Sequence, residues 1–244
     1  MPVYNNLVYL KESVDSILKQ TYSDLEFIII DDASTENVWD FLNSYDDERL
    51  VLRRNEENIG LTKSLNICLD IAKGELIARQ DGDDISLPKR LAKEAQLFEK
   101  NVGLVSCWGY SIDKSGKRFY DGDLEKKIRE SDDVTIKKRV VEKNEFSILG
   151  PACMYSREVF EKIGYYDESL YFSQDRNYWI RILKYFDVRI IREELLAYRR
   201  HDKSVRFIRN DKYGKLRGSK RKKWILSHSH KNPILKGDIR YGTQ

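Results

Sequence analysis

The sequence contains no uninterrupted apolar run that approaches the roughly 18 residues needed to cross a membrane. It also shows no charged start followed by an apolar stretch, the pattern of a secretory signal peptide. Of its 244 residues, 41% are hydrophobic and 34% are charged, which is typical of one substantial α/β domain with some appended elements. We therefore expect a soluble, cytoplasmic protein.

Cysteine is scarce, and the sequence shows no internal repeat. Cys68, Cys107 and Cys153 are the only three cysteines, and each is embedded in an apolar strand or helix pattern. Three widely spaced cysteines form neither a disulfide framework nor a zinc-binding spacing. We expect buried thiols in a reducing compartment rather than a redox or zinc role.

Strand-like and helix-like patterns alternate through the first hundred residues, which is the signature of a parallel sheet covered by helices. Asn5 and Asn6 are expected to cap the first helix, and Pro88 to occupy the first turn of the last. Apolar spacing predicts helices at about residues 7–18, 36–45, 61–72 and 88–98. Strands are predicted at 25–30, 50–52 and 76–81.

The second half is less regular. It predicts a strand at 102–110, a charged and variable region at 111–147, and another strand at 151–155 before a short helix near Val159. A helix pattern returns from Asp175, with its apolar residues on one side.

Three carboxylates, those of Asp81, Asp83 and Asp84, follow the apolar run at 76–78. Ligands bind at the carboxyl ends of strands in open α/β sheets, and hard divalent ions take oxygen ligands from carboxylates and substrate phosphates. We expect Asp81 and Asp83 to bridge a metal to a diphosphate. A solvated acidic loop is the alternative.

Two other patterns of acidic residues are set aside. Asp121 and Asp123 also form an Asp-x-Asp tripeptide, but they lie in a polar loop and are interpreted as a turn. A calcium-binding loop starting at Asp81 would need an acid or amide and then Gly, where this sequence has Ile85 and Ser86.

Basic residues are concentrated near the C-terminus. Residues 199–223 contain twelve Lys or Arg against two Asp, a net charge of +10, so the rest of the chain carries −6. A basic tail on an acidic body predicts a localised anionic partner.

The order and spacing of several motifs resemble the family 2 glycosyltransferases of the GT-A fold, an inverting group that builds bacterial surface polysaccharides. The resemblance is strong over about residues 1–100 and weaker to about 204. It is carried by MPVYN at 1–5, SILKQTY at 16–22, IIIDDAS at 28–34, NIGL at 58–61 with Asn66, AKGE at 72–75, and ARQDGDDISLPKRL at 78–91.

The resemblance implies an α/β, Rossmann-like, mostly parallel sheet flanked by helices. It implies a GT-A domain at 1–204, with a nucleotide-binding half at 1–100 and an acceptor-binding half at 101–204. Residues 205–244 would form a basic, helical C-terminal extension. Relatives usually carry several strand residues before MPVY, so most of the first strand is expected to be missing.

The resemblance also assigns the donor site. Asp83 and Asp81 would bind Mn²⁺ or Mg²⁺ on the diphosphate of a nucleotide sugar, where the metal neutralises growing charge. Asp32 would contact the base. Pro2, Tyr4 and Asn58 would line the nucleotide pocket. The alternatives are a helix cap for Asp32 and a core position for Tyr4.

Asp175 matches the catalytic base of the family, which takes a proton from the acceptor hydroxyl. The alternative is an ordinary helix N-cap. The family usually has Glu before this Asp, whereas this chain has Gln174, which removes one negative charge near the base.

The segment 198–204 resembles one that closes over the diphosphate in relatives. It implies that His201 is a further metal ligand and that Arg199 or Arg200 binds phosphate. A solvated loop is the alternative. His228 and His230 are expected to be surface residues.

We therefore expect an enzyme that transfers a hexose or N-acetylhexosamine from a nucleotide sugar to a glycan or lipid-linked acceptor. The favoured donor is a UDP-sugar. The basic segment 212–226 is expected to hold it peripherally on the anionic inner face of the plasma membrane. A sugar-phosphate nucleotidylyltransferase is a rival, but it should carry a Gly-rich loop where this chain has Tyr4-Asn5-Asn6. A nucleic-acid-binding module is suggested only by the tail, and no nucleic acid is expected.

Overall fold

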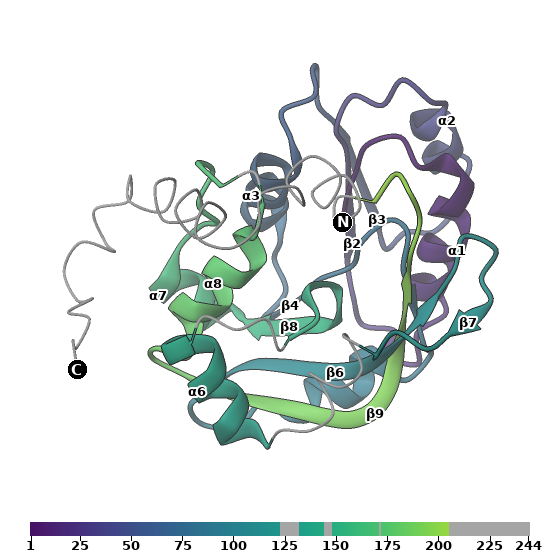
Figure 1. The fold of residues 1–244 in the computed structure, drawn as a ribbon. Coiled ribbons are helices and arrows are strands. Elements are labelled where there is room, and N and C mark those ends of the chain that lie inside the picture. The colour runs from purple at the N-terminus through teal and green to yellow at the C-terminus, as the bar shows by residue number, and fades with distance from the viewer. Residues whose placement is uncertain (123–131, 144–147, 171, 205–244) are drawn as a thin grey trace, which may run out of the picture.

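The computed structural model describes residues 1–122, 132–143, 148–170 and 172–204. It is an α/β structure in which helices pack against two sheets (Figure 1). The basic segment 212–226, His228 and His230 lie outside the described residues, as does Asp123. Among the residues that are described, no helix combines the length and the apolar character of a membrane span.

The first sheet is entirely parallel and three-stranded. Its order is β1 (Pro2–Val3), β2 (Phe27–Asp31), β3 (Leu50–Arg54). The amphipathic helices α1 (Leu7–Leu18) and α2 (Val38–Asn43) bury their apolar faces in the same core as this sheet. Every residue of β2 is buried, as its continuous apolar run predicts.

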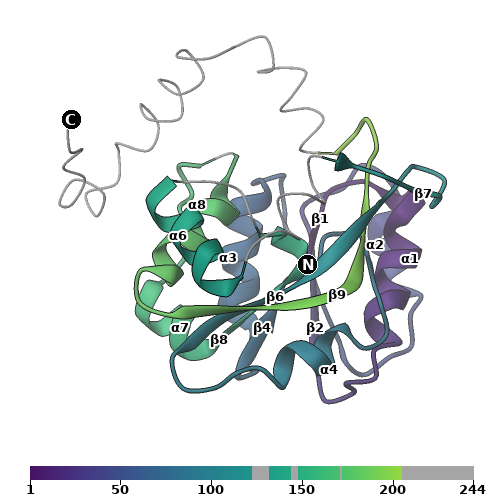
Figure 2. The same ribbon diagram turned by 60° about the horizontal axis from the view of Figure 1, so that its bottom comes forward.

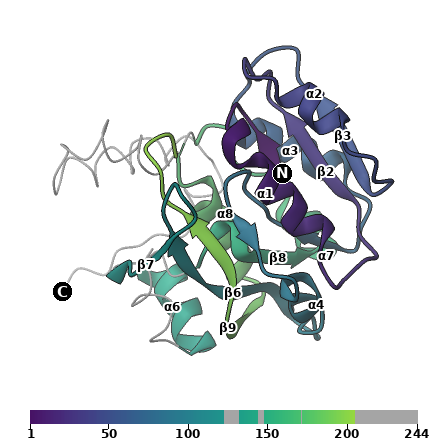
Figure 3. The same ribbon diagram turned by 90° about the vertical axis from the view of Figure 1, so that its right-hand side faces the viewer.

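The second sheet is mixed and lies beside the first (Figures 2 and 3). Its order is β4 (Leu76–Ala78), β8 (Cys153–Ser156), β6 (Val102–Ile112), β9 (Asp187–Arg199) and β5 (Ile85–Ser86), with β7 (Arg118–Phe119) paired to β6. Its longest ladder is parallel, between β6 and β9, and the shorter pairings of β4–β8, β6–β8, β5–β9 and β6–β7 are antiparallel.

Helix α3 (Leu61–Ile71) joins the two halves. It contacts β1 and β2, yet its Leu65 and Leu69 lie in the core of the second sheet with Tyr178 and Trp179. The other helices among the described residues are α4 (Arg90–Ala95), α6 (Asp133–Lys143), α7 (Arg157–Ile163), α8 (Gln174–Leu183) and the 3₁₀ turn Gly150–Ala152. One helix of the predicted nucleotide-binding half, α3, therefore shares its hydrophobic core with the second half of the chain.

The predicted helices and strands are found in order, but the predicted cap of α1 is wrong. Asn6 adopts a left-handed conformation and its side chain makes no capping hydrogen bond. The N–H of Leu7 instead donates to Glu36 Oε2 at 2.8 Å, while Asn5 Oδ1 accepts from the N–H groups of Thr35 and Glu36. The cap comes from a distant loop, which local pattern does not reveal.

Two predicted boundaries also shift. Pro88 precedes α4 rather than lying in its first turn, and its carbonyl accepts from the N–H of Thr21 at 2.8 Å. Strand β4 ends at Ala78, so Arg79 and Gln80 belong to the loop that leads to Asp81. Cys107 and Cys153 are buried as expected, and Cys68 is half-buried.

Helix α4 carries a fully buried pair of opposite charges. Arg90 Nε lies 3.9 Å from Glu94 Oε2, and both side chains are 0% exposed. Burial raises the pKa of Glu94 from 4.5 to about 7, against the opposing effect of the Arg90 charge.

This pKa predicts that Glu94 makes the protein less stable as pH rises. The folded state holds the Glu94 proton more tightly, so its contribution is fully present below about pH 4.5 and is lost as pH rises through about 7. Relative to Glu94→Gln, the wild type should lose about 3 kcal/mol of unfolding free energy over this range. Urea unfolding at several pH values measures the difference, with the exposed Glu99→Gln as control. A difference that does not change with pH would contradict the prediction.

Candidate active site

The acidic segment after β4 is ordered by one buried amide. Gln80 Nε2 donates to the Asp81 carbonyl at 3.1 Å, to the Asp84 carbonyl at 2.8 Å and to Ser13 Oγ at 3.0 Å. Ser13 Oγ in turn donates to the Asp81 carbonyl at 2.8 Å. The loop from 80 to 84 is therefore fixed against α1 by buried hydrogen bonds.

Asp83 and His201 meet across 118 positions of sequence. Asp83 Oδ2 lies 2.8 Å from His201 Nε2, with side chains 22% and 3% exposed. Strand β9 brings His201 to this place, and the ring of Tyr9 packs on the imidazole with centroids 4.7 Å apart. The predicted metal ligands Asp83 and His201 are thus side by side.

Asp83 Oδ2 and His201 Nε2 are hydrogen-bonded directly to each other at 2.8 Å. A divalent cation would replace this hydrogen bond, with the Asp83 carboxylate and the neutral His201 imidazole as its protein ligands. Asp81 Oδ1 accepts from Arg79 Nη2 at 2.8 Å, and Asp81 as a further ligand stays a prediction. Among the described residues no three acidic, His or Cys side chains form a metal-holding group. A cation here would complete its shell with oxygens of the diphosphate and water.

Arg199 is engaged within the protein rather than directed toward a ligand. Its Nε donates to the Asp83 carbonyl at 2.9 Å, its Nη1 to the Asp113 carbonyl at 3.3 Å, and its Nη2 to Glu12. The side chain is 2% exposed. This geometry favours a positioning role for Arg199 over the predicted phosphate contact.

Asp84 anchors the end of β9 to the acidic loop. Its Oδ1 accepts from the N–H of Arg199 at 2.8 Å. Burial, with the nearby charges of Asp83 and Asp81, raises the pKa of Asp84 well above its usual range. Asp84 is therefore a buried residue that holds the end of β9 in place, and not a residue that faces a ligand.

Arg200 pairs with Asp121, and its guanidinium lies over the ring of Tyr198 at 5.2 Å. The Arg200 side chain is 22% exposed. The Asp121 loop thus contributes an ion pair to the segment after β9, where the sequence predicted only a turn.

Asp32 organises the loop before α3. Its Oδ1 accepts from Asn55 Nδ2 at 2.7 Å and from the N–H of Ile59 at 3.1 Å, and its Oδ2 accepts from the N–H of Gly60 at 2.8 Å. The alternative of a cap for the following helix α2 is therefore wrong. Gly60 has φ +90°, a conformation that L side chains rarely adopt.

The predicted nucleotide-binding residues Pro2, Tyr4 and Asn58 lie in β1, directly after β1, and in the loop before α3. Pro2 is buried and pairs with Ile30, Tyr4 is 49% exposed, and Asn58 is exposed in the loop held by Asp32. The core alternative for Tyr4 is wrong, because half of its side chain faces solvent.

Asp175 lies in the first turn of α8, one residue inside its start, while Ser173 occupies the N-cap position. Its Oδ1 accepts from the N–H of Arg176 at 2.7 Å. A Cβ built on Gly150 would stand 3.0 Å from Asp175 Oδ2, so that oxygen rests against the 3₁₀ turn. The simple N-cap alternative does not match this placement.

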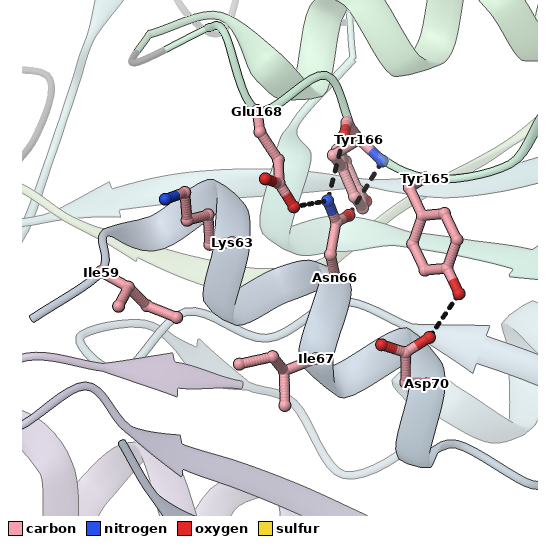
Figure 4. Close-up of a pocket in the computed structure, with 8 residues that line it drawn as sticks. All are labelled: Ile59, Lys63, Asn66, Ile67, Asp70, Tyr165, Tyr166 and Glu168. Atoms are coloured by element: carbon pink, nitrogen blue, oxygen red, sulfur yellow. Dashed lines mark hydrogen bonds between the residues drawn. The ribbon is translucent and has the colours of Figure 1, made fainter. Parts of the chain in front are cut away.

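A pocket of about 450 Å³ lies on the outer side of α3 (Figure 4). Asn66 binds Tyr166 and Glu168 across it, and Asp70 accepts from the hydroxyl of Tyr165. None of the predicted site residues lines this pocket, which is formed by Ile59, Lys63, Asn66, Ile67, Asp70, Tyr165, Tyr166 and Glu168.

Sequence reasoning missed the residues that hold the site in shape. Gln80, Asp84 and Arg90 are buried polar residues within the matched segment. All three lie beside polar neighbours in the sequence, so nothing local marked them as buried. Their distant partners, Ser13, Pro151 and the N–H of Arg199, could not be found from the sequence.

The parallel β1–β3 sheet, the acidic loop after β4 and the long β6–β9 pair define a GT-A glycosyltransferase domain. The family model described as "Glycosyl transferase family 2" matches residues 1–164, and the chain belongs to that family. Membership removes the nucleotidylyltransferase alternative.

Two relatives in sequence and one solved structure are also glycosyltransferases by name. The chain is 38% identical over 198 residues to an uncharacterized glycosyltransferase of Methanocaldococcus jannaschii, covering 78% of this chain and 66% of that one. It is 34% identical over 111 residues to the Escherichia coli UDP-Glc:alpha-D-GlcNAc-diphosphoundecaprenol beta-1,3-glucosyltransferase WfaP, covering 46% and 44%.

The fold is similar to that of the mannosyltransferase PcManGT from Pyrobaculum calidifontis, solved in complex with GDP-Man and Mn²⁺. The TM-score is 0.67 at 22% identity, covering 98% of this chain and 64% of that one. The chain thus spans less than two thirds of the length of each of these three proteins.

Proposed function

We propose that this protein transfers a sugar from a UDP-sugar to a surface-glycan acceptor, with inversion at the anomeric carbon. The observation that carries the proposal is the convergence of Asp83 and His201 on the acidic loop of a GT-A domain. The name of the related WfaP gives a UDP-sugar donor and a diphosphoundecaprenol-linked acceptor for that protein, which supports the same substrate class here.

The first half would hold the nucleotide. A carboxylate offers about four acceptor positions, and Asp32 uses three of them within the protein. The free position on Oδ2 can accept the ring N–H of uracil. The exposed ring of Tyr4 offers a face for stacking on the base.

The Asp83–His201 pair would hold Mn²⁺ or Mg²⁺ together with the diphosphate. A bound cation would neutralise the charge that the diphosphate gains as the sugar departs. Arg199 and Asp84 would keep the acidic loop and the end of β9 together during this change.

Asp175 would act as the base. The acceptor hydroxyl oxygen attacks C1 of the sugar from the face opposite the nucleotide. The bond from C1 to the diphosphate oxygen breaks, and its electron pair leaves with the diphosphate. Asp175 takes the hydroxyl proton, for which its carboxylate must lie within hydrogen-bond reach of that hydroxyl.

The predicted contact of segment 212–226 with an anionic membrane lies outside the described residues and stays a prediction. The same holds for the boundary at 204 between the catalytic domain and the extension. A peripheral location on the inner face of the membrane would bring the enzyme to lipid-linked acceptors.

Incubation with a panel of nucleotide sugars and Mn²⁺ should release nucleoside diphosphate from one or a few UDP-sugars. Slow hydrolysis is expected because water can replace the missing acceptor hydroxyl. The same sugars should raise the thermal unfolding midpoint, since binding to the folded state stabilises it. Hydrolysis is measured as released UDP, with GDP-sugars as the matched control. If no nucleotide sugar is hydrolysed or raises the midpoint, the proposal is wrong.

A further inference from the structure

The guanidinium of Arg90 is fully buried where the two halves of the proposed site meet. Its Nη2 donates to the carbonyl of Arg79 at 2.9 Å, and its Nη1 donates to the carbonyl of Pro151. A guanidinium presents its donors in a rigid planar fork. Two carbonyls bonded to the same fork are therefore held at a set separation.

On one side of this fork, Arg79 begins the acidic segment. The Arg79 N–H donates to the carbonyl of Cys153 at 2.8 Å, and its carbonyl accepts from Arg90. Arg79 Nη2 then donates to Asp81 Oδ1 at 2.8 Å. The backbone of Arg79 is fixed on both sides, and its side chain fixes Asp81.

On the other side, Pro151 belongs to the 3₁₀ turn Gly150–Ala152, which the N–H of Ala152 closes by donating to Leu149 at 3.1 Å. Gly150 faces Asp175 so closely that an added Cβ would stand 3.0 Å from Asp175 Oδ2. The turn that Arg90 holds is thus the wall behind the proposed base.

We propose that Arg90 is a positioning residue that sets the distance between the acidic segment that carries Asp83 and the Asp175 base. This inference rests on the proposed function, in which Asp83 binds the donor and Asp175 is the base. Arg90 is buried and acts through Arg79 and Pro151, and the carboxyl group of Glu94 lies 3.9 Å from its Nε. A shift of about 1 Å between reacting groups can cost about 100-fold in rate, so this link controls turnover.

Arg90→Lys is the direct test. Lysine keeps the charge, but its single ammonium cannot reproduce the planar fork that holds both carbonyls. We expect kcat for hydrolysis of the UDP-sugar identified by the panel to fall by about tenfold or more. KM for that sugar and the affinity for UDP with Mn²⁺, measured by calorimetry, should stay within about twofold, because the fold of the nucleotide half is retained.

Coupling to Asp175 separates positioning from a structural role. If Arg90 acts by placing Asp175, then Arg90→Lys and Asp175→Asn together should cost less in kcat than the product of their separate losses. The matched control is Arg157→Lys. Arg157 also donates to two carbonyls, those of Ala72 and Gly74, but ahead of β4 and away from the site. It should leave kcat unchanged.

Rate losses that multiply in the double variant would overturn the inference. If Arg90→Lys does not fold, Gly150→Ala tests the same spacing from the other side, because its Cβ would stand 3.0 Å from Asp175 Oδ2 and would press on the Asp175 carboxylate. A kcat for Gly150→Ala equal to that of the wild type would then overturn it. An inactive wild type contradicts the proposed function and this inference with it. An active wild type with multiplying losses contradicts the inference alone.

Discussion

Asp175→Asn should lower the rate of sugar transfer by about 10²- to 10⁴-fold, the range that a general base contributes. The amide keeps the shape of the carboxylate and its contact with the N–H of Arg176, but it cannot take a proton. Affinity for UDP should not change, because Asp175 lies outside the proposed nucleotide site, which is formed by the first hundred residues. Steady-state kinetics with the UDP-sugar found by the panel gives the rate, and calorimetry gives the affinity.

The matched control is Asp133→Asn. Asp133 is also an acidic residue in the first turn of a helix, α6, where its Oδ1 accepts from the N–H of Ile190 at 3.3 Å. Any general effect of removing such a charge should appear there. If Asp175→Asn retains transfer within a few-fold of the wild type, or if both variants lose activity equally, Asp175 is not the base.

Asp83→Ala should abolish the gain in UDP affinity that Mn²⁺ provides. Loss of an outer-shell partner alone costs about 10- to 100-fold in metal affinity, so loss of a ligand should cost at least as much. Calorimetric titration of UDP with Mn²⁺ and with chelator measures the gain. Asp202→Ala, an exposed carboxylate next to His201, is the matched control and should keep it. If Mn²⁺ increases the UDP affinity of Asp83→Ala as much as that of the wild type, Asp83 is not a ligand of the metal.

The alternation of helices and strands could be predicted from the sequence because each element carries its own pattern. The continuous apolar run that becomes β2 and the helical spacing of Leu61, Leu65 and Leu69 are local signals. Which sheet an element joins is not local. Strand β4 pairs with a strand about 80 residues later, and the core-facing side of α3 packs against elements more than a hundred residues later.

The candidate site shows the same division. The resemblance pointed to Asp83 and His201, and the structure brings them together. It also pointed to Arg199 or Arg200 as a phosphate ligand, whereas the guanidinium of Arg199 is buried against three partners in the protein. A motif specifies which residues recur. Whether the N–H groups of an arginine are available to a ligand depends on the packing of segments that are distant in sequence.

The ladder between β6 and β9 has a consequence for the order in which the protein folds. Asp83 and Asp84 meet their partners on the segment from Arg199 to His201 only after more than a hundred further residues have been made. Contacts so distant in sequence form late, because loop closure must be completed before they stabilise the chain. During synthesis, a ribosome-bound chain that ends before residue 199 has the acidic loop without its closing strand. Until residues 199–201 have been made, Asp84 lacks the N–H of Arg199 and Asp83 lacks the imidazole of His201, so the proposed donor site is incomplete in any shorter nascent chain.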